Sequence, residues 1–304
     1  MLMSDVERYL ALRNRLGFKL RHTSRNLRAF ANFAVAQGDT YVRAVTAVEW
    51  ATAAATPSMR YRRLGDVVRL GRFLHAENAS HEVPPAGLFD APRARPAPYI
   101  YTPEELARII EVAELDVYEP NANRRETYLM LFGLIAATGL RVSEAFNLRL
   151  DDLLPNNVLR IRQTKFGKSR LVPLHKTVVV AFDRYLEMRR SVAAIDDHVF
   201  LSVKRRRLSY TTVNSAFRRI LLHADIASGR TRPPRIHDLR HSFATRILEQ
   251  CATRPEAVAR HFVALSTYMG HADAAHTYWY FQATPQLMIQ IAVAGEALVN
   301  SDVP

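Results

Sequence analysis

Cysteine is nearly absent from this sequence of 304 residues, in which Cys251 is the only thiol. One cysteine cannot form an intramolecular disulfide, which excludes a small secreted scaffold held together by disulfide bonds. We therefore expect a cytoplasmic protein whose fold depends on its apolar core, and the 48% hydrophobic content is sufficient for one.

Long hydrophobic runs are also missing. The longest, Tyr128 to Leu140, is well short of the roughly 20 residues that cross a bilayer, so it predicts a buried helix instead of a membrane span. The N-terminus lacks the apolar centre of a signal peptide, and no internal repeat or low-complexity tract is present. We expect neither secretion nor a membrane partner.

Basic residues outnumber acidic residues in this sequence. Lys and Arg number 42 against 29 Asp and Glu, which gives a formal net charge of +13 that is spread along the chain. Such an excess favours a polyanionic partner, because basic groups that face phosphates release counterions on binding. A basic soluble protein with no such partner is the alternative, and charge alone does not separate the two.

A proline-rich stretch indicates a linker between two domains. The stretch from Pro84 to Pro98 is rich in proline and has no helical period, as expected of an extended linker. We predict a mainly α protein with a small all-helical domain at 1–91, a linker at 92–100 and a mostly helical domain at 101–304. The second domain is expected to contain a small antiparallel β-hairpin.

Apolar residues before the linker recur at helical spacing, namely Leu10, Leu16, Leu20, Leu27, Phe30, Ala31 and Phe33. Arginines recur in the same segments, and four of them are candidates for contact with a phosphate backbone: Arg60, Arg62, Arg63 and Arg69. A solvated helix face is the alternative interpretation.

Helix ends can be predicted in the second domain. Thr102 and Glu105 have the spacing of a capping box at a helix start. Gly139 suits a left-handed helix end, which places Arg141 at a junction between helices. Further helices are predicted near Lys176, Thr211, Asp238, Glu256 and Pro285.

A basic hairpin is predicted between these helices. Residues 158–162 alternate apolar and basic, and 170–172 form the return strand. Lys165 and Lys168 lie in the turn between the two strands.

The sequence from His237 to His241 places two imidazoles and Arg240 on one side of a helix, where they would share a surface, with Leu239 toward the core. Two histidines four residues apart can bind zinc, but Asp238 stands where the metalloprotease pattern needs glutamate, and no third ligand is positioned by the sequence. Ordinary residues at the edge of the core are a further interpretation.

Several motifs together resemble the tyrosine recombinases, or phage-integrase family. They are Arg141 within the stretch Ala137 to Glu144, a lysine in a hairpin, His237-x-x-Arg240-His241, Gly270-His271, and Tyr280 nine residues later. The resemblance covers about Tyr101 to Ala283. It implies that residues 1–91 are a core-binding domain that contacts DNA and that residues 101–304 are the catalytic domain.

The resemblance also implies roles for these residues. Tyr280 would attack the scissile phosphodiester, leaving a 3′-phosphotyrosyl link and a free 5′-hydroxyl. Arg141 and Arg240 match the phosphate clamp, for which the planar guanidinium fork is suited. Lys165, with Lys168 as the alternative, would protonate the departing 5′-oxygen. His237 is the candidate proton acceptor, and His271 would donate to a phosphate oxygen. No metal or nucleotide cofactor is expected.

Tyr268 and Tyr278 are alternative candidates for the nucleophile, and the family spacing from His271 selects Tyr280. One departure from the family is the longer stretch between Arg240 and His271, around 249–263, which is expected to contain a loop. Helical apolar spacing in residues 285–299 predicts a tail helix, which would dock on its own domain or on a neighbouring copy.

We therefore expect a site-specific recombinase, integrase or transposase that acts on double-stranded DNA as a homo-tetramer pairing two sites, with accessory DNA-binding proteins as further candidate partners. A non-catalytic DNA-binding protein of the same fold and a type IB topoisomerase are the alternatives. Basic residues expected to contact DNA in the second domain are Lys168, Lys204, Arg205 and Arg232.

Overall fold

The structure is a computed structural model that describes residues 2–18, 20–90, 97–115, 121–162, 169–193, 196–226, 228–229, 232–251 and 255–270. The chain divides into two compact units, Met1–Pro96 and Ala97–Pro304. Within the described residues, no helix combines the length and the apolar content that a bilayer crossing needs.

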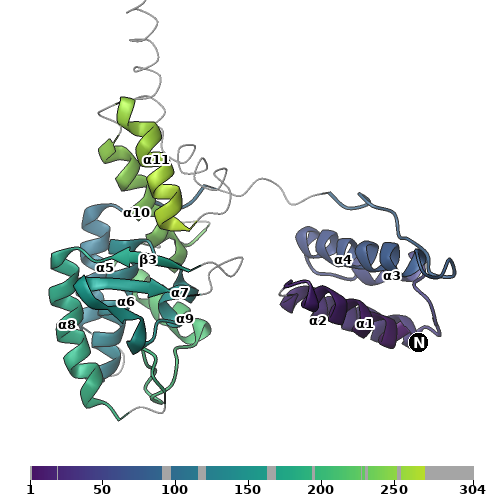
Figure 1. The fold of residues 1–304 in the computed structure, drawn as a ribbon, viewed down its shortest axis with the longest axis horizontal. Helices are drawn as coiled ribbons and strands as arrows, with labels where there is room; N and C mark the ends of the chain where they lie inside the picture. Colours follow the sequence, from purple (N-terminus) through teal and green to yellow (C-terminus); the bar gives the residue numbers. More distant parts are fainter. Residues whose placement is uncertain are drawn as a thin grey trace, which may run out of the picture. The chain divides into compact units, whose positions relative to one another are not determined.

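Four helices form the first unit: α1 (Leu2–Arg15), α2 (Arg21–Ala36), α3 (Ala44–Thr52) and α4 (Pro57–His75) (Figure 1). Leu10, Leu27 and Phe30 are buried in their shared core, as the helical spacing predicts. Leu16 is 63% exposed, because α1 ends at Arg15 and the chain turns through Gly17.

A buried carboxylate links α2 to α4 in this unit. Asp66, which is 5% exposed, accepts hydrogen bonds from the Thr23 hydroxyl at 3.1 Å and the Asn26 amide at 2.8 Å. Arg69, one helical turn after Asp66, donates to the same carboxylate at 2.6 Å. The group is therefore satisfied by three donors, as burial of a charge requires.

The second unit is mostly helical and contains one small sheet. Its longer helices are α5 (Pro103–Leu115), α6 (Ala122–Thr138), α8 (Lys176–Ser191), α9 (Tyr210–His223), α10 (Ile236–Cys251) and α11 (Pro255–Met269). Its shorter elements are α7 (Val142–Phe146), the 3-10 turns η1 (Leu150–Asp152) and η2 (Pro155–Asn157), and strands β1 (Leu153–Leu154), β2 (Val158–Ile161) and β3 (Arg170–Pro173). The predicted fold class, mainly α with a small antiparallel sheet, is confirmed.

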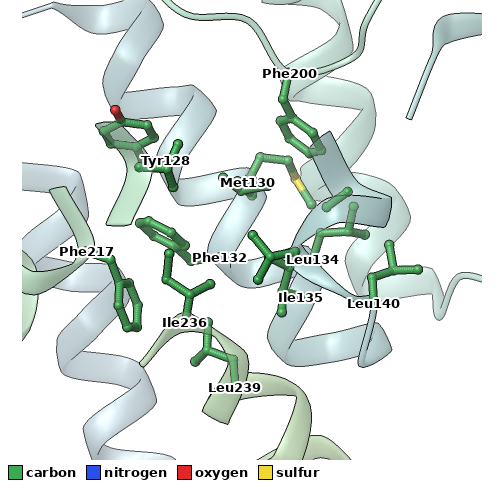
Figure 2. Close-up of a cluster of buried hydrophobic side chains, with 14 of the residues drawn as sticks. Tyr128, Met130, Phe132, Leu134, Ile135, Leu140, Phe200, Phe217, Ile236 and Leu239 are labelled. Atoms are coloured by element: carbon green, nitrogen blue, oxygen red, sulfur yellow. The ribbon is translucent and has the colours of Figure 1, made fainter. Parts of the chain in front are cut away.

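Helix α6 is the centre of the second unit. It packs against α5, α8 and α10, and Leu131, Leu134 and Ile135 are fully buried. Phe132 meets Phe217 of α9 with ring centroids 4.9 Å apart (Figure 2). The long apolar run of the sequence is thus a core helix, since a helix that is apolar on most sides must be buried.

Both predicted helix ends are present. The Thr102 hydroxyl accepts from the backbone N–H of Glu105 at 3.1 Å, and the Glu105 carboxylate accepts from the N–H of Thr102 at 3.0 Å. Gly139 ends α6 with a φ of 61°. A Cβ at Gly139 would lie 2.5 Å from Cδ1 of Phe243 on α10, so close packing as well as the backbone requires glycine there.

The predicted hairpin is formed by β2 and β3, and the sheet has the order β1-β2-β3 with antiparallel pairs. Leu159 pairs with Val172, and both are buried in the core. The short strand β1 was not predicted, because two residues are too few for an alternating pattern. The turn that holds Lys165 and Lys168 lies outside the described residues.

The long stretch from Glu249 to Val263 is mainly helical where the structure describes it. Helices α10 and α11 lie side by side and share a small core that includes Leu248, Leu265 and Met269 (Figure 1). The helix predicted near Glu256 is present as α11, and the three residues between the two helices, where the expected loop would lie, are outside the described part. The predicted tail helix at 285–299 also lies outside it.

Candidate active site

Arg240 projects from α10 into the protein and is only 1% exposed. Its Nη1 donates to the carbonyl of Gly139 at 2.5 Å, and its Nη2 donates to the carbonyl of Met269 at 2.8 Å. The expectation of a shared surface with the two histidines is wrong for Arg240, because these carbonyls at the ends of α6 and α11 draw the guanidinium inward. Arg240 thereby joins three helices.

Arg141 lies beside this junction at the start of α7, and its side chain is 23% exposed. Its Nη2 donates to the carbonyl of Gly270 at 3.1 Å. Arg141 and Arg240 therefore bind the consecutive carbonyls of Met269 and Gly270, and the structure brings together two residues that the sequence separates by 99 positions. Both guanidiniums lie at the turn that leads to His271.

Glu144 orients Arg141 from one helical turn away. Its Oε1 accepts from Nη1 of Arg141 at 2.7 Å, and its Oε2 accepts from the backbone N–H of Arg141 at 2.9 Å. Arg170 donates to the same two oxygens at 2.8 and 2.7 Å. Burial would raise the pKa of Glu144, but the bonds and charge of Arg170 and Arg141 outweigh it and lower the pKa to about 2.

Glu144 and Arg170 were not among the predicted site residues. Glu144 carried a weak signal, because it stands three residues after Arg141 and so can return a bond to the helix start. Arg170 carried no local signal, since its partner Glu144 lies 26 residues away and the contact depends on how β3 packs.

His237 lies at the start of α10 with part of its surface exposed, and its ring meets the ring of His241 edge to face, with centroids 4.7 Å apart. Packing of protein around the ring, followed by the positive charge of Arg240, lowers its pKa to about 4. Arg235 and Arg141 act in the same direction, and Asp238 opposes them. The imidazole is therefore neutral at physiological pH and can accept a proton.

The carboxylate of Asp238 binds Arg235, so it is not available as a ligand beside the two histidines. The carboxylate accepts from the backbone N–H of Arg235 at 2.8 Å and from Nη2 of the same residue at 2.9 Å. The part of the chain that the structure describes holds no group of three side chains suited to bind a metal ion. The zinc interpretation of His237 and His241 gains no support from this geometry.

Lys165, Lys168, His271, Tyr278 and Tyr280 lie outside the described residues. Their roles therefore stay predictions.

Tyr268, the third candidate nucleophile, is described: it stacks on Phe243 with centroids 5.8 Å apart. Burial raises its pKa despite the nearby charges of Arg170 and Arg240. A raised pKa is the opposite of what a nucleophilic hydroxyl needs.

The arginines predicted to contact DNA in the first unit fall into two groups. Arg60 donates to the carbonyl of Ala54 at 2.9 Å, Arg63 lies over the Trp50 ring at 4.7 Å, and Arg69 bonds Asp66. Arg62 is exposed. In the second unit Lys204, Arg205 and Arg232 are also exposed.

Similarity to known proteins identifies the family of this chain. The model of the phage integrase family matches residues 100–286. The chain belongs to the phage-integrase, or tyrosine-recombinase, family. Tyrosine recombinase XerD of Brucella suis is 28% identical over 232 residues, covering 74% of this chain and 71% of XerD.

Two further comparisons extend the match over more than nine-tenths of this chain. The integrase/recombinase y4rB of Sinorhizobium fredii is 36% identical over 292 residues, which is 93% of each chain. The crystal structure of a lambda integrase tetramer bound to a Holliday junction aligns with a TM-score of 0.65 at 18% identity, covering 91% of this chain and 76% of that one. The second alignment supports the fold.

The described part of this tyrosine recombinase is suited to bind an anion. Arginine forks form paired hydrogen bonds with phosphate oxygens and keep their charge near neutral pH. Arg141 is partly exposed at the junction, and Arg240 and Arg170 surround the same turn. A neutral imidazole is available next to them in His237.

Proposed function

We propose that this protein cleaves and rejoins duplex DNA by strand transfer through a tyrosine, with Tyr280 as the nucleophile. The observation that carries the proposal is the convergence of Arg141 and Arg240 on the carbonyls of Gly270 and Met269. A phosphoryl-transfer site needs positive charge on the non-bridging oxygens more than it needs other covalent help. The family membership of the chain supports the same chemistry.

The proposed reaction conserves the phosphodiester bond energy. The Tyr280 oxygen attacks the scissile phosphorus and loses its proton to His237, while the bond from phosphorus to the 5′-oxygen breaks. The departing 5′-oxygen takes a proton from Lys165, or from Lys168. A 3′-phosphotyrosyl link and a 5′-hydroxyl result, and the 5′-hydroxyl of a second strand then reverses these transfers.

The other residues of the site have supporting roles in this proposal. Arg141 and Arg240 hold the non-bridging oxygens, and His271 donates a ring N–H to one of them. The lowered pKa of His237 supports its role, because a neutral imidazole is the form that accepts a proton. Because the arginines supply positive charge and the lysine supplies the proton, these proposed steps need no metal ion.

We also propose that four copies assemble on two paired DNA sites. Lambda integrase, which shares the fold, is a tetramer on a Holliday junction in its crystal structure. Residues 1–91 and residues 101–304 would each contact the DNA, and the exposed cations Arg62, Lys204, Arg205 and Arg232 are the first candidates for phosphate contacts. The net charge of +13 supports a polyanionic partner.

Covalent trapping on nicked DNA tests the nucleophile. DNA that flanks the gene would be nicked just beyond the expected cleavage position, so that the short strand with the new 5′-hydroxyl diffuses away and cannot reverse the reaction. Wild type is expected to form an adduct that survives a denaturing gel, and Tyr280→Phe is expected to form none.

Tyr278→Phe is the matched control, because it removes a hydroxyl two residues away from Tyr280 and should leave the adduct intact. An adduct that persists in Tyr280→Phe and disappears in Tyr278→Phe would move the nucleophile. Sequence-specific binding with no adduct in wild type would instead favour a non-catalytic DNA-binding protein.

A further inference from the structure

Arg170, the first residue of β3, is largely buried beside the candidate phosphate clamp, with 11% of its side chain exposed. Its two terminal nitrogens donate to the two oxygens of Glu144 at 2.8 and 2.7 Å. Such a paired fork sets the plane of the carboxylate as well as its position. Since Glu144 also binds Arg141 twice, the position of Arg141 depends on Arg170 through one intermediate residue.

The same side chain supports the turn after α11. A Cβ at Gly270 would lie 3.1 Å from Nη1 of Arg170 and 3.3 Å from its Cδ, so the backbone rests directly on the guanidinium. Gly270 has a φ of 65° and accepts from Nη2 of Arg141 through its carbonyl. Arg170 therefore contacts both of the groups that hold Arg141.

Charge gives Arg170 a second effect on the clamp. Glu144 alone would neutralise Arg141, whereas two guanidiniums against one carboxylate leave the trio with one net positive charge. A phosphate group that approaches Arg141 thus meets a cationic cluster instead of a closed ion pair. This matters because the local dielectric constant near buried groups is low.

We propose that Arg170 is a positioning residue for strand transfer, which holds Arg141 through Glu144 and Gly270 and keeps Glu144 from cancelling the charge of the clamp. The inference rests on the proposed function, and it adds a residue outside the set that the family motifs identify. Arg170 acts on the phosphate through Arg141.

The first test is a double-mutant cycle on the rate of covalent adduct formation with nicked DNA. Arg170→Met is expected to slow the reaction about 100-fold, as misplacement of an orienting group does. In a Glu144→Gln background the same change should cost less than about tenfold, because no uncompensated carboxylate remains. Arg170→Lys keeps the charge but loses the fork, so an intermediate rate is expected.

A pH profile separates positioning from loss of structure. In Arg170→Met the buried Glu144 loses its main cationic partner, so its pKa rises and it takes up a proton as the pH falls. Among the described residues, Arg141 at the start of α7 and Tyr268 on α11 are the other titratable groups that face this cluster. A protonated Glu144 no longer cancels the charge of Arg141, so the adduct rate of Arg170→Met should fall less steeply than that of wild type on the acidic side. Glu144→Gln should remove this difference.

Arg160→Met is the matched control, because Arg160 lies on the adjacent strand and binds Asp152 with Nε at 3.2 Å. It should leave the adduct rate unchanged. The proposal would be overturned if Arg170→Met slows adduct formation by the same factor in the wild-type and Glu144→Gln backgrounds and leaves the pH profile unshifted. Circular dichroism shows whether the variant is folded.

Titration with inorganic phosphate gives a readout that needs no cleavage. Affinity should fall in Arg170→Met and recover in part when Glu144→Gln is added, and no recovery would count against the charge argument. If wild type binds phosphate in this pattern but forms no adduct, the proposed function fails while the role of Arg170 stands.

Discussion

Nη1 of Arg240 and the carbonyl oxygen of Gly139 are separated by 101 residues in sequence and by 2.5 Å in space. Together with the bond from Arg240 to Met269, this contact joins the end of α6, the first half of α10 and the end of α11. The residue expected to bind phosphate is thus also part of the fold. Changes at Arg240 should therefore affect stability as well as activity.

Arg240→Met should lower the free energy of unfolding by about 2 kcal/mol, because two buried carbonyls lose their donor. Arg141→Met should lower it by less than about 1 kcal/mol, since Arg141 is partly exposed and Glu144 keeps Arg170 as a partner. Urea unfolding followed by circular dichroism measures both. Equal effects of the two substitutions would contradict the structural role of Arg240.

Gly139→Ala should destabilise the second unit by about 2 kcal/mol or more, through the positive φ and the contact with Phe243. Gly133→Ala is the control within the same helix. Its Cβ would meet nothing closer than Cδ1 of Ile110 at 4.0 Å, so it should be neutral or stabilising by up to about 1 kcal/mol. Thermal melting of both variants gives the comparison, and similar melting temperatures would contradict it.

His237 should make stability depend on pH. Its folded pKa of about 4 lies below the ordinary value of 6.5, so the unfolded chain binds a proton that the folded chain does not. This contribution to stability is present above the ordinary value and is lost progressively as the pH falls from about 6.5 to about 4. The melting temperature of His237→Gln should therefore fall less than that of wild type when the pH is lowered.

NMR titration measures the His237 pKa directly. The imidazole signal that disappears in His237→Gln should titrate below the ordinary value for histidine. A midpoint at or above that value would contradict the neutral imidazole on which the proton-accepting role depends.

Asp66→Asn should destabilise the first unit by about 2 kcal/mol, because three donors share one buried carboxylate there. Trp50 lies in the core of that unit, and the second tryptophan is Trp279. In a Trp279→Phe background, fluorescence therefore reports on the first unit alone. Glu7→Gln is the control, since its ion pair with Arg28 is exposed and screened by solvent, so its loss should leave the stability of the first unit nearly unchanged.

The sequence by itself determined the local features of this protein. Helical spacing predicted the helices, the pair Thr102 and Glu105 predicted a helix start, and Gly139 predicted a helix end. The motif order predicted the family. Each of these signals depends on residues within a few positions of one another, or on types and spacings that need no coordinates.

Only the tertiary structure decided which arginines face inward and what holds them. Arg240 is buried because carbonyls from two distant helix ends converge on it, and Arg60 and Arg63 are drawn to carbonyl or aromatic partners in their own unit. The bond between Arg170 and Glu144 joins residues that are 26 positions apart in the sequence. Such contacts join segments that folding brings together, so no local pattern in the sequence encodes them.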